Sequence, residues 1–140
     1  MDVERLEQSI TEVMTTPART TDPDLSVAAV ARVLWNERIG SLIVTDERGA
    51  PTGIVTESDV VRGVGAGHDP RAMTVAELMT TSVVTIDADG TVRDASARMR
   101  EHDIKKLPVV EDDELVGVVT TTDLAHSLAP SLGDVIQTFE

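Results

Sequence analysis

The most constraining feature of this sequence is that it repeats itself. The segment from Val13, VMTTPARTTDPDLSVAAVARVLWNERIGSLIV, aligns without a gap with the segment from Leu78, LMTTSVVTIDADGTVRDASARMREHDIKKLPV. Identical residues in the two segments, such as Met14 and Met79, stand 65 positions apart. After a one-residue deletion in the second copy, GIVTESDV aligns with GVVTTTDL. Two copies of one unit predict a fold made of two similar halves.

Each copy shows the same order of local patterns. An extended piece, expected at 19–21 and 83–86, is followed by a turn that contains aspartate. A helix then begins at Ser26 and at Thr91, which are good N-caps, and Asp94 is placed to complete a capping box. Two strands and a closing helix follow in each copy, expected at 41–45, 52–55 and 58–64, and at 107–110, 115–119 and 122–128. The unit is therefore predicted to be β-α-β-β-α.

A unit of about 60 residues buries too little apolar surface to be stable alone. The expected fold is therefore α+β (mixed α/β), with two β-α-β-β-α repeats packed sheet to sheet in pseudo-twofold symmetry. Residues 2–14 are predicted to form one leading amphipathic helix, and the tail after Pro130 a short final helix. The expected division is 1–64 for the leading helix and first repeat, 65–74 for a linker, 75–130 for the second repeat and 131–140 for a tail.

The charge balance excludes several partners. The chain has 12 basic and 25 acidic residues, a net charge of −13, which disfavours nucleic acid and anionic membrane surfaces. No apolar run is long enough for a membrane span, and the charged start MDVERLEQ is unlike a signal peptide, so a cytoplasmic protein is expected. The acidic, lysine-poor composition fits either a halophilic source or an arginine-biased genome.

The sequence contains no arrangement typical of an enzyme or a metal protein. Cysteine is absent, and His68, His102 and His126 lack metal-ligand spacing. No Ser/His/Asp arrangement, Walker loop or GxGxxG motif is present. The Asp87-Ala-Asp89-Gly90 stretch has a faint likeness to a calcium loop but is interpreted as a turn, and Glu111–Glu114 as a solvated hairpin turn. Neither catalytic residues nor metal ligands are predicted.

These motifs resemble those of a known family, the tandem cystathionine-β-synthase (CBS) domain pair, or Bateman module. The resemblance rests on V-M-T-T and L-M-T-T, on I-G-S-L-I-V-T-D beside I-K-K-L-P-V-V-E, and on G-I-V-T-E-S-D beside G-V-V-T-T-T-D, and it covers residues 12–130. It implies a regulatory homodimer that binds AMP, ADP, ATP or S-adenosylmethionine between the copies. Such a module performs no chemistry, requires no cofactor and acts on a regulated protein, here unidentified.

The resemblance also implies binding residues, in two sites that each combine segments of both copies. Asp59 and Asp123 would bind the ribose. One implied site contains Thr120, Thr122 and Asp123, with Thr16, Pro17, Ala18, Ile39, Gly40 and Ser41. The other contains Thr56, Ser58 and Asp59, with Thr81, Ser82, Val83, Ile104, Lys105 and Lys106. The threonine and serine hydroxyls that precede each aspartate would lie near a phosphate, and the remaining segments would line the adenine.

Physical chemistry supports these roles but leaves alternatives open. An ionised aspartate accepts hydrogen bonds from a ribose diol, whereas Thr-x-x-Asp at a helix start is equally a capping box that needs no ligand. Lys105 and Lys106 are either phosphate ligands or a solvated pair favoured by a helix dipole. In the first copy Gly40 and Ser41 replace them. The Asp59 site is therefore expected to bind phosphate better, and the Asp123 site to prefer an uncharged adenosyl group or to stay empty.

Trp35 and a second functional class complete the sequence-based expectations. Trp35 aligns with Arg100, so it lies on a helix face that need not be core. It is either a partly buried packing residue or a dimer contact. The alternative function is a structural dimerisation or scaffold module with vestigial clefts, which would be sensitive to changes on the face that carries Trp35.

Overall fold

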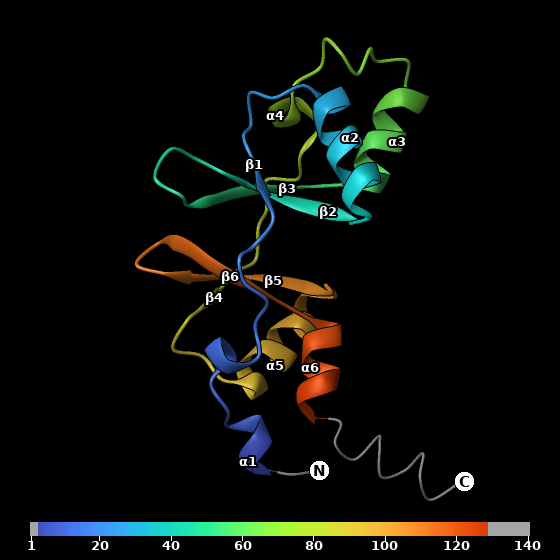
Figure 1. Ribbon diagram of the computed structural model, residues 1–140. Helices are drawn as coiled ribbons and strands as arrows, with labels where there is room; N and C mark the ends of the chain where they lie inside the picture. Colours follow the sequence, from blue (N-terminus) through green and yellow to red (C-terminus); the bar gives the residue numbers. More distant parts are fainter. Residues whose placement is uncertain (1–2, 129–140) are drawn as a thin grey trace, which may run out of the picture. The chain divides into compact units, whose positions relative to one another are not determined.

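The computed structural model describes residues 3–128, and the helix expected after Pro130 lies outside them. Figure 1 shows the elements in chain order. They are α1 (Val3–Leu6), η1 (Ile10–Glu12), β1 (Thr20–Thr21), α2 (Val27–Glu37), β2 (Ser41–Thr45), β3 (Pro51–Thr56), α3 (Glu57–Gly65), α4 (Val75–Leu78), β4 (Ile86–Asp87), α5 (Val92–His102), β5 (Lys106–Glu111), β6 (Glu114–Thr120) and α6 (Thr121–Leu128).

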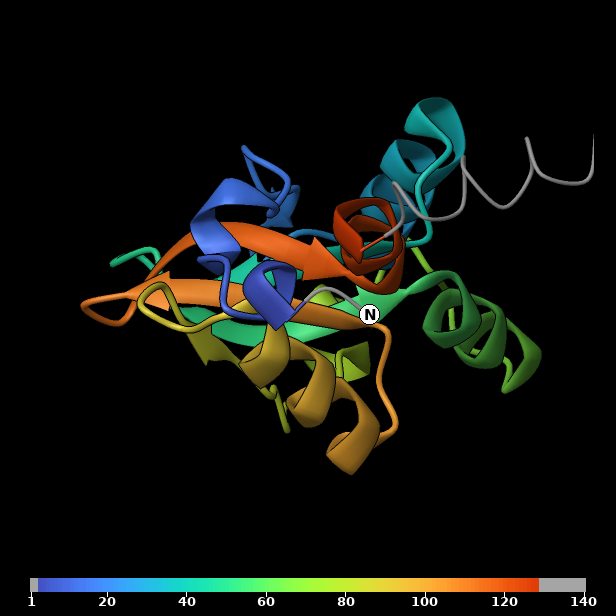
Figure 2. The same cartoon turned by 90° about the horizontal axis from the view of Figure 1, so that it is seen from below.

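The two repeats each form the predicted β-α-β-β-α unit, which confirms the mixed α+β class. One sheet has the strand order β1-β2-β3 and the other β4-β5-β6. In each sheet the short first strand pairs in parallel with the middle strand, and β2 pairs antiparallel with β3 so that Leu42 lies opposite Val55. Helices α2 and α3 cover one face of the first sheet, and α5 and α6 cover one face of the second (Figures 1 and 2).

Local sequence signals define where the main helices begin and end. The Ser26 hydroxyl caps α2 by accepting from the Ala29 N–H at 3.1 Å. Thr91 and Asp94 form the predicted capping box at α5. Both helices are 11 residues long and are followed by a C-cap residue in the left-handed region, Arg38 after α2 and Asp103 after α5. The equal lengths and equal terminations show that the repeat in the sequence is a repeat in structure.

The single leading helix predicted for residues 2–14 is wrong. Helix α1 ends at Leu6, and the chain turns before the short 3-10 helix η1. Ser9 has an extended backbone and caps η1, and it forms an antiparallel bridge with Thr91. The Ile10 N–H donates to the Gly90 carbonyl at 3.0 Å, and the Ile10 side chain is fully buried. Pairing with the turn before α5 and burial of Ile10 thus replace the continuous helix that the apolar spacing favoured.

The chain divides into two compact units that do not follow the order of the repeats. The first-repeat unit contains Arg19–Val83 and Asp113–Leu115. Of the described residues, the second-repeat unit contains 3–18, Val84–Asp112 and 116–128. Each leading segment therefore belongs to the unit of the other repeat. Ile10, in the leading segment of the first repeat, is part of the second-repeat core, and Val75, at the start of the second repeat, is part of the first-repeat core.

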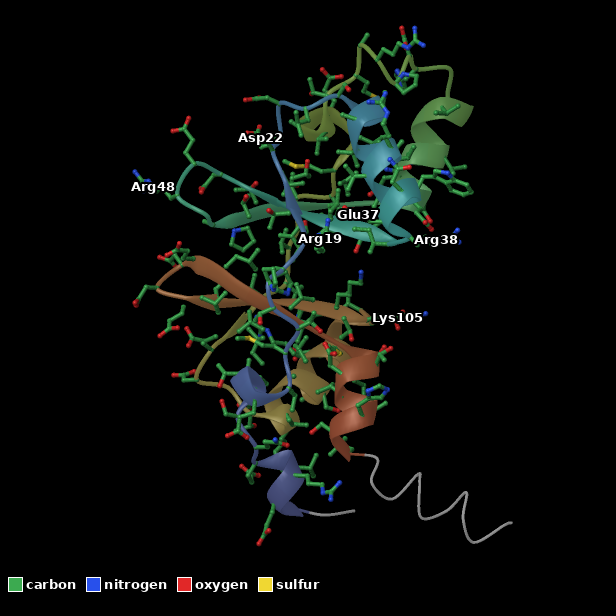
Figure 3. All side chains as sticks on the ribbon, in the orientation of Figure 1. Arg19, Asp22, Glu37, Arg38, Arg48 and Lys105 are labelled. Carbon is green, nitrogen blue, oxygen red and sulfur yellow. The ribbon has the colours of Figure 1, made fainter. Side chains whose placement is uncertain are left out.

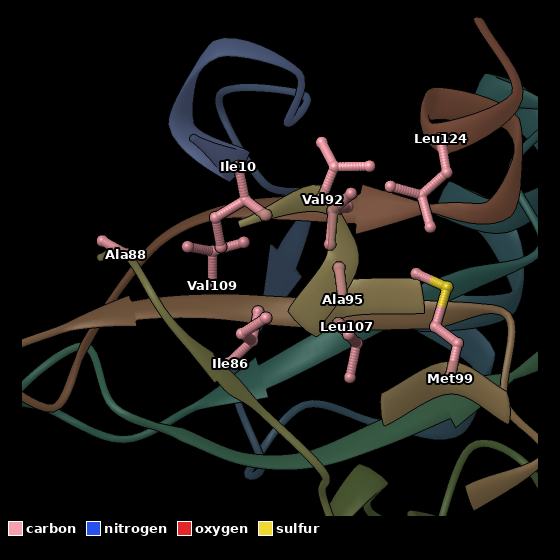
Figure 4. Close-up of a cluster of buried hydrophobic side chains, with 10 residues drawn as sticks. Ile10, Ile86, Ala88, Val92, Ala95, Met99, Leu107, Val109 and Leu124 are labelled. Carbon is pink, nitrogen blue, oxygen red and sulfur yellow. The ribbon is translucent and has the colours of Figure 1, made fainter. Parts of the chain in front are cut away.

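Each unit has its own hydrophobic core beneath its sheet, and the two cores use aligned residues. The second-repeat core is drawn in Figure 4. It consists of Ile10, Ile86, Ala88, Val92, Ala95, Met99, Leu107, Val109, Val119 and Leu124. The first-repeat core consists of Val27, Val30, Leu34, Leu42, Val44, Val55, Val75 and Leu78. Ile10 and Val75 occupy equivalent positions in the two cores. The Ile10 N–H donates to the Gly90 carbonyl, and the Val75 N–H donates at 2.9 Å to the carbonyl of Leu25, the residue aligned with Gly90.

Candidate functional site

The Thr-x-x-Asp motif forms the junction between a strand and a helix in each unit. The Thr56 hydroxyl accepts from the Asp59 N–H at 3.1 Å, and the Thr56 N–H donates to Asp59 Oδ2 at 2.9 Å. Thr120 and Asp123 repeat these bonds at 3.0 and 2.9 Å. The capping interpretation of both motifs is therefore confirmed. The caps fix each carboxylate at the N-terminus of α3 or α6, the positive end of the helix dipole.

The Met-Thr-Thr segments lie against the strands that lead into these junctions. Thr80 and Ile54 exchange backbone hydrogen bonds of 2.9 and 3.0 Å, and Thr15 and Val118 exchange bonds of 2.7 and 3.1 Å. Each segment extends the hairpin of the other repeat by one bridged residue. Two motifs that stand apart in the sequence therefore form one structural feature in each unit.

Close approach explains why the strand motif begins with glycine. A Cβ atom at Gly53 would lie 2.5 Å from the Met79 sulfur, and one at Gly117 would lie 2.6 Å from the Met14 sulfur. Carbon atoms in contact normally stand about 3.5–4.0 Å apart, so neither position has room for a side chain. The methionine and the glycine of the repeated motifs are thus contact partners in the fold.

The two carboxylates have different surroundings. Asp59 is 4% exposed, and its Oδ1 lies 3.0 Å from Nη2 of Arg62, one helical turn further on. The half-buried Asp123 accepts instead from the Thr15 hydroxyl, at 3.1 Å to Oδ1 and 3.3 Å to Oδ2. His126 occupies the position aligned with Arg62, and Asp123 and His126 both line a cavity of about 870 Å³ within the second-repeat unit.

The structure brings together two of the three segments of each implied site within one unit. The second-repeat unit holds Thr16, Pro17, Ala18, Thr120, Thr122 and Asp123, whereas Ile39, Gly40 and Ser41 belong to the first-repeat unit. The first-repeat unit holds Thr56, Ser58, Asp59, Thr81, Ser82 and Val83, whereas Ile104, Lys105 and Lys106 belong to the second-repeat unit. The Thr16–Pro17 peptide bond is cis. Lys105 lies just before β5 and Lys106 is its first residue, and both lysines are exposed.

An ion pair joins the residue before β1 to the last residue of α2, just before the Ile39–Ser41 segment. Arg19 and Glu37 lie side by side there (Figure 3). The hydrogen bond donated by Arg19 lowers the pKa of the Glu37 carboxyl and raises that of the guanidinium. The sequence reasoning did not assign Arg19, Arg62 or Thr15. Only Arg62 had a local signal, because opposite charges three residues apart on a helix lie on one face.

The Asp87-Ala-Asp89-Gly90 stretch is a turn, as predicted. The Asp89 N–H donates to Asp87 Oδ1 at 3.1 Å, and the Gly90 N–H donates to the Asp87 carbonyl at 2.9 Å. The nearby Asp87 carboxylate raises the pKa of Asp89. Within residues 3–128, no three His, Cys, Asp or Glu side chains are grouped to hold a metal ion. The Glu111–Glu114 stretch is also a hairpin turn, in which Asp112 and Asp113 have φ values of 52° and 66°.

The chain is therefore a tandem-repeat module of two β-α-β-β-α units. In each unit a threonine and an aspartate form a capping box next to a Met-Thr-Thr segment. The CBS domain family model matches residues 10–66 and again residues 75–130. The chain therefore belongs to the CBS domain family and carries two copies of the domain, which confirms the resemblance found in the sequence.

Individual relatives agree with this assignment. The chain is 32% identical to the CBS domain-containing protein YhcV of Bacillus subtilis, over 84% of this chain and 83% of that protein. It is also 32% identical to hypoxic response protein 1 of Mycobacterium tuberculosis, over 74% of this chain and 73% of that protein. The crystal structure of the CBS domain pair of protein MJ0100, in complex with 5′-methylthioadenosine and S-adenosyl-L-methionine, superposes with a TM-score of 0.77. It is 26% identical and is matched over 98% of its chain and 89% of this one.

Other relatives are longer than this chain. The match spans 32% of an uncharacterised protein of Methanocaldococcus jannaschii and 22% of an L-aspartate semialdehyde sulfurtransferase from the same organism. An enzyme name among the relatives thus belongs to a protein of which the CBS pair is a small part. Across residues 3–128 no helix has the length and apolar character needed to cross a membrane.

Proposed function

We propose that this chain is a regulatory sensor that binds an adenosine-containing ligand, AMP, ADP, ATP or S-adenosylmethionine, between its two CBS copies. One observation carries the proposal. In each unit a carboxylate, Asp59 or Asp123, lies at the N-terminus of the helix that follows the strand bridged to a Met-Thr-Thr segment. The Ile39–Ser41 and Ile104–Lys106 segments would complete the two sites when the repeats pack sheet to sheet. The complex of the MJ0100 CBS pair with two adenosyl compounds supports this ligand class.

The local chemistry suits such a ligand. An ionised carboxylate accepts hydrogen bonds from the two hydroxyls of a ribose. The N-termini of α3 and α6 favour a nearby anion, which here would be a phosphate or carboxylate of the ligand. Ser58 and Thr122 stand exposed in the first turns of these helices and add hydroxyl donors. No further cofactor enters this scheme.

The regulatory step would be a change in the relation between the two copies. A ligand that bridges both copies stabilises the arrangement in which both halves of its site are in place. The surface offered to a second copy and to a regulated partner would change with it. We place this activity in the cytoplasm, where adenine nucleotides are abundant.

Adding ligand is expected to raise the free energy of unfolding by about 2.7 kcal/mol when its concentration is 100 times the dissociation constant. The measurement is thermal unfolding with AMP, ADP, ATP and S-adenosylmethionine in turn. Asp59→Asn and Asp123→Asn are each expected to reduce the shift, because they remove the ribose acceptor charge. Asp94→Asn is the matched control, since Asp94 forms the same capping box at α5 outside either implied site. A panel with no shift at millimolar concentration would contradict the sensor.

A second candidate, a dimerisation or scaffold module, is favoured by an exposed apolar face. Trp35 is 82% exposed, so its interpretation as a partly buried packing residue is wrong. Val61 and Val64 of α3 are also exposed, and Glu57 shares their helix face and lines a cavity of about 400 Å³ with Trp35. All the exposed large hydrophobic residues of the described chain lie in the first repeat. We therefore propose a second copy of this chain as the occupant of this face.

Trp35→Ala is expected to weaken that homodimer by roughly tenfold or more, because buried tryptophans dominate interface energies. Sedimentation equilibrium gives the dimer dissociation constant. Arg100→Ala, at the aligned position of the second repeat, should leave it unchanged. A dimer that resists Trp35→Ala would place the interface elsewhere, and one that forms identically with and without every ligand would favour the scaffold over the sensor.

A further inference from the structure

Arg62 holds the carboxylate of Asp59 in the first-repeat unit. Its Nη2 lies 3.0 Å from Asp59 Oδ1, while Asp59 Oδ2 accepts from the Thr56 N–H at 2.9 Å. Both carboxylate oxygens therefore already have a partner. The Asp59 side chain is 6% exposed and that of Arg62 is 65% exposed, so the guanidinium lies on the solvent side of a buried carboxylate. A group that approaches Oδ1 from solvent therefore meets the Arg62 guanidinium and competes with it for this oxygen.

The second repeat lacks this ion pair at the aligned position. His126 replaces Arg62 there and does not carry the permanent positive charge of a guanidinium. Asp123 accepts from the Thr15 hydroxyl, a neutral donor that can rotate away at little cost. The Asp59 carboxylate is thus paired with a guanidinium, whereas the Asp123 carboxylate accepts from a neutral hydroxyl.

We propose that Arg62 is a specificity-determining residue that makes the Asp59 site select adenosyl ligands with a phosphate. The inference rests on the proposed function. A ribose that binds Asp59 releases the Arg62 guanidinium from its partner. A ligand with a 5′-phosphate offers the released guanidinium a new anionic partner, and Arg pairs strongly with phosphate. Adenosine and methylthioadenosine have no phosphate, so their binding breaks the Arg62–Asp59 ion pair without giving Arg62 a new partner. The Asp123 site imposes no such requirement.

The test compares AMP with adenosine by isothermal titration calorimetry, in an Asp123→Asn background that isolates the Asp59 site. Arg62→Gln is expected to strengthen adenosine binding about two- to fivefold, because a partly exposed ion pair no longer has to be broken. The same variant should weaken AMP binding, so the preference for AMP falls by about tenfold or more. Arg62→Lys should retain part of the preference. Arg71→Gln removes an exposed arginine outside both sites and is the control.

The reciprocal variant transfers the selectivity. In an Asp59→Asn background, His126→Arg is expected to install the ion pair on Asp123, weakening adenosine and strengthening AMP at that site. Thermal unfolding of each variant without ligand checks that the fold is intact. If Arg62→Gln shifts AMP and adenosine binding equally, or neither, the inference is overturned while the sensor stands. If neither compound binds the unmodified chain or its variants, the proposed function fails and the inference with it.

Discussion

Replacing Ile10 with alanine is expected to lower the free energy of unfolding by about 2–5 kcal/mol, the range for removing a fully buried Ile or Leu side chain. Ile10 is 0% exposed and lies in the second-repeat core with Val92, Val109 and Leu124. Ile10 belongs to the leading segment of the first repeat, so the loss of stability measures how firmly this segment packs in the core of the other repeat. Val75→Ala, at the aligned place in the first-repeat core, should also destabilise, by less because fewer methylenes are lost.

Urea unfolding at equilibrium measures this loss. Glu12→Ala, two residues further along η1 and exposed, is the matched control and should change the free energy of unfolding by less than about 0.5 kcal/mol. A loss below about 1 kcal/mol for Ile10→Ala would mean that the leading segment is not part of the core. The variant should also loosen Thr15, which holds Asp123, so ligand binding at Asp123 is a second readout of the same segment.

Placing alanine at Gly53 or Gly117 is expected to cost about 1–3 kcal/mol each, the usual range for overpacking a core. The new methyl group would meet the Met79 or Met14 sulfur, and a backbone carbonyl lies 3.1 Å away in both places, from Thr80 and Thr15. The carbonyl belongs to the bridged Met-Thr-Thr segment, so the strain cannot be relieved by the methionine side chain alone. The segment itself must shift, and the implied ligand site shifts with it.

Equilibrium unfolding again supplies the measurement. Gly65→Ala at the end of α3, where no atom lies within 4 Å of the added carbon, is the control and should be neutral or slightly stabilising. Combining Gly53→Ala with Met79→Ala should cost less than the sum of the two single changes, because the contact is shared. Additive costs would show that the glycine and methionine do not interact.

Much of the fold could be predicted because its signals are local. The short apolar runs at 41–45 and 107–110 predict strands, and Ser26 and Thr91 with the helical spacing that follows them predict α2 and α5. The failure at residues 2–14 has the opposite origin. Val3, Leu6, Ile10 and Val13 are spaced as on one helix, yet the pairing of Ser9 with Thr91 and the burial of Ile10 are long-range contacts that helical spacing does not report.

The two carboxylates of the candidate site could be predicted from the sequence, but the side chains that contact them could not. Asp59 and Asp123 follow from the repeated motif, and their capping role follows from Thr-x-x-Asp at a helix start. Thr15 reaches Asp123 across more than 100 residues of sequence, so no local pattern announces it. Arg62 stands within one helical turn of Asp59, but spacing alone does not say that the carboxylate is buried beneath the guanidinium.

The sequence by itself determined that the chain is two copies of one β-α-β-β-α unit, because periodicity and caps act between neighbours in the chain. The tertiary structure alone decided that the two leading segments exchange places. Gly53 and Gly117 both leave room for a methionine, and Leu42 and Leu107 are aligned core residues of the two copies. The sequence pattern therefore permits the segment around Ile10 to pack on either copy. Only the complete packing of each core determines which leading segment packs on which copy.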